Sequence, residues 1–228
     1  WEFVNSREPH DEFQEFKQAK STLYDNTLHS VSKKVSQFLE DIKESSSDPI
    51  VVITSDHGEE MWEWASFEEK NFEDPRDVFG VGHGHALIPE VVEVPLFTSG
   101  FSDLEDHNLT SATDILPTIL SELGISDSRL NSFDGFPLQH QQGEDRTILC
   151  EEVAYGYEQT AVIDSSHHLI HAPHEYGNIL IDRQDNKITN DQSREKSLLD
   201  NISNNKKSGK SLEIDENTEE RLSDLGYL

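Results

Sequence analysis

A continuous run of β-branched residues, at positions 50–54, is the feature that most constrains the fold of this chain. Such a run is typical of a strand buried on both faces, the kind found inside a parallel sheet. In the preceding segment, residues 13–42, apolar side chains recur at steps of three, four and seven, which predicts a long amphipathic helix. The Ser- and Pro-containing stretch at residues 45–49 ends that helix. A helix followed by a buried strand is half of a doubly wound α/β unit, so the sequence predicts an α/β fold.

The rest of the chain divides into two parts of different character. Residues 93–98 predict a second strand, and residues 110–124 predict a helix that Gly124 ends. After about residue 140, short strand-like pieces separated by turns favour a small antiparallel sheet; they lie at 147–153, 159–164, 167–171 and 178–182. Residues 183–211 are polar and are expected to be a loop or poorly ordered, and residues 217–225 predict a helix.

The charge of the chain excludes several kinds of partner. Asp and Glu number 46 against 18 Lys and Arg, which gives a formal net charge of -28. Nucleic acids and anionic lipids are bound through Lys and Arg, so neither is an expected partner. Two interpretations of the acidity are open, partial disorder with solvating charge, or a folded protein adapted to high salt. Because the apolar runs are intact, the second is favoured, and it suggests the cytoplasm of a halophile.

The cysteine count and the lack of a long apolar stretch bear on where the protein is located. The single cysteine, Cys150, excludes an internal disulfide framework. No apolar stretch approaches the ~20 residues of a membrane-spanning helix, and no signal peptide is visible. A cytoplasmic protein without a membrane span is therefore expected.

An Asp-His pair directly follows the predicted strand at residues 50–54. Asp56 and His57 stand where sites form in open α/β sheets, beyond the carboxyl end of a strand. A carboxylate oxygen beside an imidazole suits a divalent cation, and Gly58 would let the backbone turn so that both side chains face one point. The alternative is that Asp56 caps a following helix and that His57 only packs.

A second histidine cluster comes some 25 residues later. His83 and His85 stand two residues apart in a glycine-rich segment, where imidazoles can ligate a metal, bind an anion or protonate a leaving group. The alternatives are a solvated loop histidine or adventitious metal binding. Together with Asp56 and His57, these residues point to a site that hydrolyses an anionic ester with the help of a metal.

Several motifs in order resemble the sulfatase family of the alkaline phosphatase superfamily. The similar segments read TSDHGEE at 54–60, GHGHALIPEVVEVPL at 82–96, TSATDILPTILSELGI at 110–125 and FDGFPL at 133–138. The last eleven residues, TEERLSDLGYL, are similar to the ending of many members. The resemblance implies the C-terminal part of an α/β domain with a mainly parallel sheet flanked by helices, at residues 1–139. A small antiparallel-sheet subdomain with a polar loop and a C-terminal helix would follow at residues 140–228.

The resemblance also implies roles for individual residues. Asp56 and His57 match a metal-ligating pair of the family, and His83 matches the Lys or His that contacts sulfate or phosphate oxygens. His85 is a less certain second anion contact. The cofactor implied is a divalent cation, Ca²⁺ first, with Mn²⁺, Mg²⁺ or Zn²⁺ as alternatives. The implied substrate is an anionic ester, a sulfate or phosphate ester, and the acidic-aromatic loop around Trp62 and Trp64 could stack a sugar.

Two family elements have no counterpart in this sequence. The family's early Asp pair is missing, and so is a Cys or Ser nucleophile in the pattern Cys/Ser-x-Pro-x-Arg. Cys150 is followed by two glutamates, which would raise the pKa of its thiol, so a packed residue is expected there. The chain is therefore expected to be the C-terminal portion of such an enzyme, inactive alone, with a missing N-terminal half as a possible partner. A gene fragment, a truncated gene and half of a split enzyme are the three explanations.

Two rival functions stay open at this point. A phosphodiesterase, phosphonate monoester hydrolase or phosphoethanolamine-type transferase of the same superfamily could carry the same Asp-His pair. A non-catalytic acidic remnant that binds partners or metal is the alternative from a different class.

Overall fold

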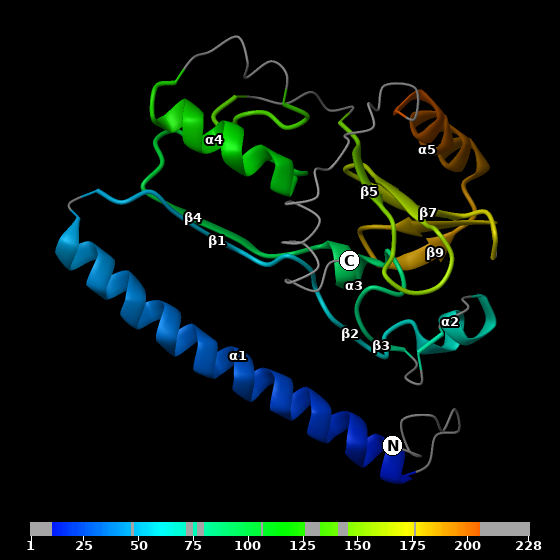
Figure 1. Ribbon diagram of the computed structural model, residues 1–228. Helices are drawn as coiled ribbons and strands as arrows, with labels where there is room; N and C mark the ends of the chain where they lie inside the picture. Colours follow the sequence, from blue (N-terminus) through cyan, green and yellow to red (C-terminus); the bar gives the residue numbers. More distant parts are fainter. Residues whose placement is uncertain are drawn as a thin grey trace, which may run out of the picture.

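The structure is a computed structural model that describes residues 11–46, 48–71, 75–76, 80–105, 107–125, 133–140, 146–175 and 177–205. Figure 1 shows a long N-terminal helix, a two-stranded ribbon with a helix above it, and a five-stranded sheet at the other end of the molecule. The elements in chain order are α1 (Asp11–Ser45), β1 (Val51–Thr54), β2 (Glu60–Met61), α2 (Ala65–Asn71), β3 (Val81–Gly82), α3 (Pro89–Val92), β4 (Leu96–Ser99), the 3-10 helix η1 (Ala112–Asp114), α4 (Ile115–Glu122), β5 (Ile148–Glu151), β6 (Thr160–Ile163), β7 (His167–Ala172), β8 (Gly177–Asp182), β9 (Lys187–Thr189) and α5 (Gln192–Asn205).

The predicted helix and strand at the start of the chain are both present. α1 leads through a short turn into β1, and α1 and α4 lie on opposite sides of the β1–β4 ribbon (Figure 1). Near its C-terminal end, α1 brings Leu39 and Ile42 next to Val51 and Ile53 of β1, where they line a common pocket. The amphipathic pattern of α1 therefore faces the ribbon over its last turns.

The expected parallel sheet is not confirmed. β1 pairs antiparallel with β4, with Val51 opposite Ser99 and Thr54 opposite Leu96, and every strand pairing among the described residues is antiparallel. Val51, Val52 and Ile53 are half-buried rather than fully buried. The reason is that a β-branched run encodes a preference for burial in a strand, whereas the direction of the partner depends on residues far away in the sequence.

A compact segment between β1 and β4 carries the residues of interest. β2 and β3 pair antiparallel over only two residues, Glu60 with Gly82 and Met61 with Val81. This pairing joins the two ends of the segment that contains α2, so the glutamates at 59 and 60 lie beside the histidines at 83 and 85. The site is thus assembled by a short ladder that the sequence did not reveal.

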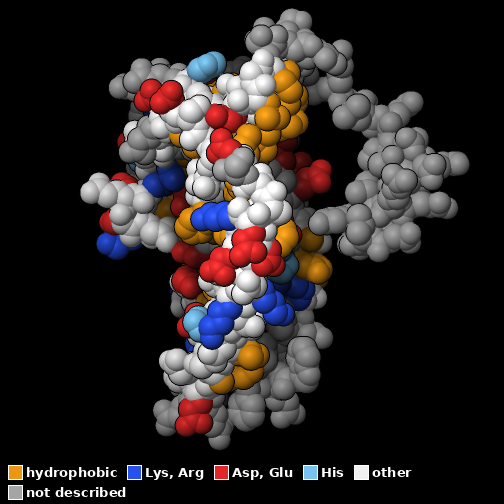
Figure 2. Space-filling model, turned by 90° about the vertical axis from the view of Figure 1, so that its left-hand side faces the viewer, with side chains coloured by type: hydrophobic (Ala, Val, Ile, Leu, Met, Phe, Trp, Pro, Cys, Tyr) orange, Lys and Arg blue, Asp and Glu red, His pale blue; other side chains and the backbone are white. Residues whose placement is uncertain are grey.

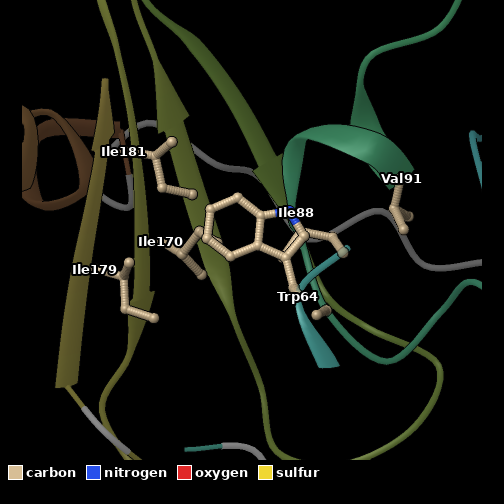
Figure 3. Close-up of a cluster of buried hydrophobic side chains, with 7 residues drawn as sticks. Trp64, Ile88, Val91, Ile170, Ile179 and Ile181 are labelled. Carbon is tan, nitrogen blue, oxygen red and sulfur yellow. The ribbon is translucent and has the colours of Figure 1, made fainter. Parts of the chain in front are cut away.

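The five-stranded antiparallel sheet, in the order β5-β6-β7-β8-β9, is covered on both faces. Successive residues of a strand point to opposite faces. Leu169 and Leu180 pack with Leu198 and Ile202 of α5 on one face. On the other face, Ile170, Ile179 and Ile181 pack with Trp64, Ala86, Ile88 and Val91. In Figure 3 the Trp64 ring extends toward the strands that carry these isoleucines. Each such fully buried side chain contributes about 1.5–3 kcal/mol relative to an exposed one.

The C-terminal part confirms the predicted antiparallel sheet and corrects one expectation. The four strand-like pieces correspond to β5 to β8. The polar stretch at 183–211 was expected to lack regular structure, but it contains β9 and α5. Asp191 caps the start of α5 by accepting hydrogen bonds from the backbone N–H groups of Ser193 and Arg194. The helix packs on the sheet through Leu198 and Ile202. The helix predicted at 217–225 lies outside the described residues.

Much of α1 faces solvent in this structure. Leu23 is 68% exposed and Phe38 is 62% exposed. Figure 2 shows hydrophobic side chains in separate patches between charged ones on the face that it displays. None of the helices in the described part of the chain combines the length and the apolar character needed to cross a membrane.

Candidate functional site

The turn after β1 is held close to α3. The backbone N–H of Gly58 donates a hydrogen bond to Val91 O at 2.7 Å. A Cβ atom at position 58 would lie 2.0 Å from Glu90 O, so only glycine allows this approach. The glycine after Asp56 and His57 is therefore required by a close contact between two backbone segments, in addition to the turn that the sequence suggested.

Asp56 and His57 point two ligand atoms toward one region. His57 Nδ1 donates to Gly58 O at 2.9 Å, because a carbonyl oxygen can only accept, and this leaves Nε2 with a free lone pair. Asp56 Oδ1 lies 3.7 Å from that Nε2. A hydrogen bond from the Asp56 backbone and the nearby His57 ring lower the pKa of Asp56, which keeps the carboxylate ionised. The Asp56 carboxylate is thus in the state that a cation requires.

His83, which stands between Gly82 and Gly84, lies against the ring of His57. Gly82 and Gly84 have φ angles of 99° and 80°, values that other residues rarely adopt. The rings of His57 and His83 stack with their centroids 3.6 Å apart. His83 Nδ1 donates to Glu59 Oε2 at 2.8 Å, so its Nε2 is free to act on a ligand. The Arg76 guanidinium donates a hydrogen bond to His83 O at 3.1 Å, which helps to hold the backbone of this loop.

Glu59 brings the predicted metal residues and the predicted anion contact into one cluster. One ligand atom from each of His57, Glu59 and His83 lies within 4.8 Å of the others, and all three residues are accessible to solvent. Two imidazoles and a carboxylate are a donor set that holds a divalent cation. Asp56 and Glu59 both place carboxylate oxygens near His57.

A pocket of about 670 Å³ opens beside this cluster. Its walls include Asp56, His57 and His83, together with Cys150 of β5 and Arg183 after β8. Arg183 donates to Glu93 Oε1 at 3.1 Å and to Asp164 O at 2.9 Å, which holds its guanidinium at the pocket wall. The antiparallel sheet therefore contributes a guanidinium to the pocket, whose walls also carry the carboxylates of Glu93 and Glu152.

His85 does not join the other predicted site residues. It is 3% exposed and does not line the pocket; its Nε2 lies 2.8 Å from Glu60 Oε2 and 3.1 Å from Glu68 Oε1. Burial alone would lower the pKa of His85, but the hydrogen bond to Glu60 and the Glu68 carboxylate 3.1 Å away outweigh burial and raise it to about 9. His83 and His85 lie in different environments although they stand only two residues apart, and the backbone bends at Gly84, whose φ is 80°.

Sequence reasoning missed two residues of the site, Glu59 beside His83 and Arg183 at the pocket wall. Glu59 was part of the motif, yet no role was inferred for it; its position beside an Asp-His pair was the available signal. Arg183 had no signal, because it follows an ordinary strand and stands 100 residues after His83.

The rings of Trp62 and Trp64 are packed against the protein and do not form an open binding surface. Trp62 is 8% exposed and Trp64 is 9% exposed. Lys17 and Lys20 of α1 stand 5.1 and 5.7 Å from the Trp62 ring centroid, and Trp64 packs against the five-stranded sheet (Figure 3). The expectation that a sugar stacks on these rings is wrong, because both rings are already covered by protein.

Cys150 has the character of a packed residue. It lies on β5 opposite Ala161, and burial raises the pKa of its thiol. The direction agrees with the expectation, although burial rather than the flanking glutamates is the cause. A raised pKa leaves little thiolate at neutral pH, so the side chain is a poor nucleophile.

Comparison with family models identifies the family of this chain. A family model described as Sulfatase matches residues 3–125. No curated protein matches this chain. Among solved structures, a putative sulfatase from Bacteroides thetaiotaomicron VPI-5482 is 18% identical, with a TM-score of 0.48, over 74% of this chain and 39% of that one. BT1596, a 2-O GAG sulfatase, is 19% identical, with a TM-score of 0.46, over 73% of this chain and 38% of that one. The chain thus spans about two fifths of the length of these structures.

Proposed function

The chain belongs to the sulfatase family, and we propose that it supplies the cation-binding and anion-binding part of an active site for the metal-dependent hydrolysis of sulfate esters. In this proposal, Asp56 and His57 hold a divalent cation, and His83 Nε2 contacts the oxygens of the anionic substrate. Residues 1–139 form the C-terminal portion of the catalytic α/β domain, and residues 140–228 form a subdomain that lines the pocket through Arg183. His85 is left out of the substrate site, because two buried carboxylates beside it would repel an anion.

The distance of 3.7 Å between Asp56 Oδ1 and His57 Nε2 is the observation that carries this proposal. Two ligands of one ion, each about 2.0–2.4 Å from it, stand about 3–4 Å apart when the angle between them lies between a right angle and a tetrahedral one. The free lone pair of His57 and the ionised state of Asp56 meet the chemical requirement as well. The residues present therefore fit the group that the family implies.

The chemistry divides between the cation and the side chains around it. A bound cation would act as a Lewis acid on the ester oxygens. The chain's own part is to fix the geometry: the Glu59 carboxylate accepts from His83 Nδ1 and directs Nε2 outward, where an imidazolium N–H can donate to an anion. Arg183 lies at the pocket wall in an ion pair with Glu93, so it positions a guanidinium there without adding net charge.

The donor set indicates a divalent cation but does not select one element. Ca²⁺ prefers oxygen ligands, whereas an imidazole suits Zn²⁺ or Mn²⁺ better. Two protein ligands also leave most of the coordination shell to water or to further protein groups. The proposed enzyme therefore also needs the family's early Asp pair and its nucleophile, neither of which is encoded in residues 1–228.

Activity measurements on the chain expressed together with its upstream coding region test this proposal. We expect turnover of an aryl sulfate in the presence of Ca²⁺, Mn²⁺ or Zn²⁺, and a loss of at least roughly 100-fold in kcat/KM in Asp56→Ala. Asp48→Ala, an exposed carboxylate outside the pocket, is the matched control and should keep the parent's rate. Equal kcat/KM in Asp56→Ala and the parent refutes the cation assignment.

The same assay separates the rival functions. Faster turnover of an aryl phosphodiester or phosphonate ester than of the sulfate would assign the chain to the phosphoryl-transfer relatives of the superfamily. No turnover of either ester class, with the upstream region present, would favour a non-catalytic acidic protein. An upstream region that lacks both the nucleophile and the Asp pair would refute the enzyme proposal outright.

A further inference from the structure

A second cluster of metal-ligating side chains lies inside the protein. Glu60 of β2, Glu68 of α2 and His85 after β3 are 0%, 1% and 3% exposed. One ligand atom from each lies within 4.8 Å of the other two. His85 Nε2 is 2.8 Å from Glu60 Oε2 and 3.1 Å from Glu68 Oε1. Three separate elements therefore converge on one point that water does not reach.

Two members of this Glu60–Glu68–His85 cluster are held by hydrogen bonds from their surroundings. Glu60 Oε1 accepts from the backbone N–H of Trp64 at 3.1 Å, which directs Oε2 toward His85. Gln159 of the antiparallel sheet donates to His85 O at 3.2 Å and fixes the backbone of the third residue. Fixed ligands lower the entropy cost of binding an ion, so the cluster is organised before any ion arrives.

The cluster has too few hydrogens for its acceptors. His85 Nε2 carries at most one hydrogen, and two carboxylates approach it. Glu68 Oε1 is buried and has no hydrogen-bond partner, although it points at the shared nitrogen. A buried carboxylate oxygen without a donor costs free energy unless something positive compensates it.

The net charge of the Glu60–Glu68–His85 cluster also favours a bound cation. With both glutamates ionised and His85 protonated, the three side chains sum to one negative charge in a buried volume; with a neutral imidazole and a divalent cation, the sum is zero. Arg76 and Lys17 act on this cluster electrostatically, but neither supplies a hydrogen bond to Glu68 Oε1. A cation placed among the three ligand atoms would satisfy that oxygen and remove the net charge together.

We propose that Glu60, Glu68 and His85 form a closed binding site for a divalent cation of the Zn²⁺ or Mn²⁺ class. One imidazole nitrogen and two carboxylates match the donors that these ions take. Ligands of a tetrahedral ion stand about 3.3–3.5 Å apart, so the separations of 2.8 and 3.1 Å from His85 Nε2 need to open by about 0.5–0.7 Å and about 0.2–0.4 Å. Because the site is closed, its role is structural: it ties β2 and α2 to the loop that carries His83. The proposal does not depend on the proposed function.

Metal retention by the purified chain tests this site. In an Asp56→Ala/His57→Ala background, which removes the exposed pair, we expect one equivalent of Zn²⁺ or Mn²⁺ to remain after gel filtration. A hundredfold excess of the cation over its Kd should raise Tm by roughly 5–10 °C. Glu68→Gln, nearly the same shape, should lose both effects, and the exposed Glu63→Gln is the matched control that should keep both.

X-ray absorption of the Zn²⁺-loaded chain covers the case in which Glu68→Gln fails to fold. A shell of nitrogen and oxygen ligands with one imidazole supports the site. No retained cation in the Asp56→Ala/His57→Ala background, equal retention in Glu68→Gln, or a shell without imidazole overturns it.

Discussion

His168 makes the stability of this protein sensitive to acid. It lies on β7 with no exposed surface, and its Nε2 donates to Leu87 O at 2.8 Å. Its Nδ1 is buried without a hydrogen-bond partner, so a proton added there would stay unpaired. Burial, helped by the charge of Arg183 and opposed by the Leu87 hydrogen bond, lowers the pKa of His168 from 6.5 to about 4.

The sign and size of the effect follow from linkage. Between pH 4 and pH 6.5 the unfolded chain binds a proton at His168 and the folded protein does not, so the free energy of unfolding rises with pH over this window. The stabilisation is fully present above pH 6.5 and is lost as the pH falls toward 4. The loss is about 2 kcal/mol at pH 5 and about 3 kcal/mol once the pH reaches 4.

Urea unfolding followed by far-UV circular dichroism at pH 7 and pH 5 measures this effect. His168→Gln can still donate to Leu87 O but does not titrate, so its free energy of unfolding should fall by about 2 kcal/mol less than that of the parent. His167→Gln on the same strand, where the ring is half-exposed, is the matched control and should keep the parent's loss. Equal losses in the parent and in His168→Gln would refute the reasoning.

Three further predictions concern packing and charge. Asp114→Ala should lower the free energy of unfolding by about 3–5 kcal/mol, because it removes the buried carboxylate that accepts hydrogen bonds from two nitrogens of Arg146, each at 2.8 Å. An effect below about 1 kcal/mol in urea unfolding contradicts this. Gly58→Ala should lower the melting temperature clearly more than Gly124→Ala, because Glu90 O blocks a Cβ atom only at position 58. Equal melting temperatures of the two variants would contradict the close contact. If the acidity is an adaptation to salt, Tm should rise from 0.1 M toward about 2 M KCl, where the Debye length is below about 3 Å; a flat or falling Tm would exclude the halophile interpretation.

The local patterns of the sequence predicted most of the secondary structure. Apolar spacing identified α1, the β-branched run identified β1, and the alternating pieces after residue 140 identified β5 to β8. The motif that contains Asp56 and His57 also came from the sequence, because a strand, a glycine turn and a ligand pair are neighbours along the chain. These features depend on interactions within a few residues, which a local pattern records.

The pairings between distant segments were decided only by the tertiary structure. The sequence did not show that β1 would meet β4 antiparallel, that α5 would form from a polar stretch, or that His85 would leave His83 and join two glutamates inside the protein. Each outcome depends on contacts across roughly 20 or more residues, or on burial at a surface formed by other strands. Hydrophobic pattern and residue type determine which segments tend to be buried and which groups can bind a cation, whereas only the packed chain determines which of those groups share one site.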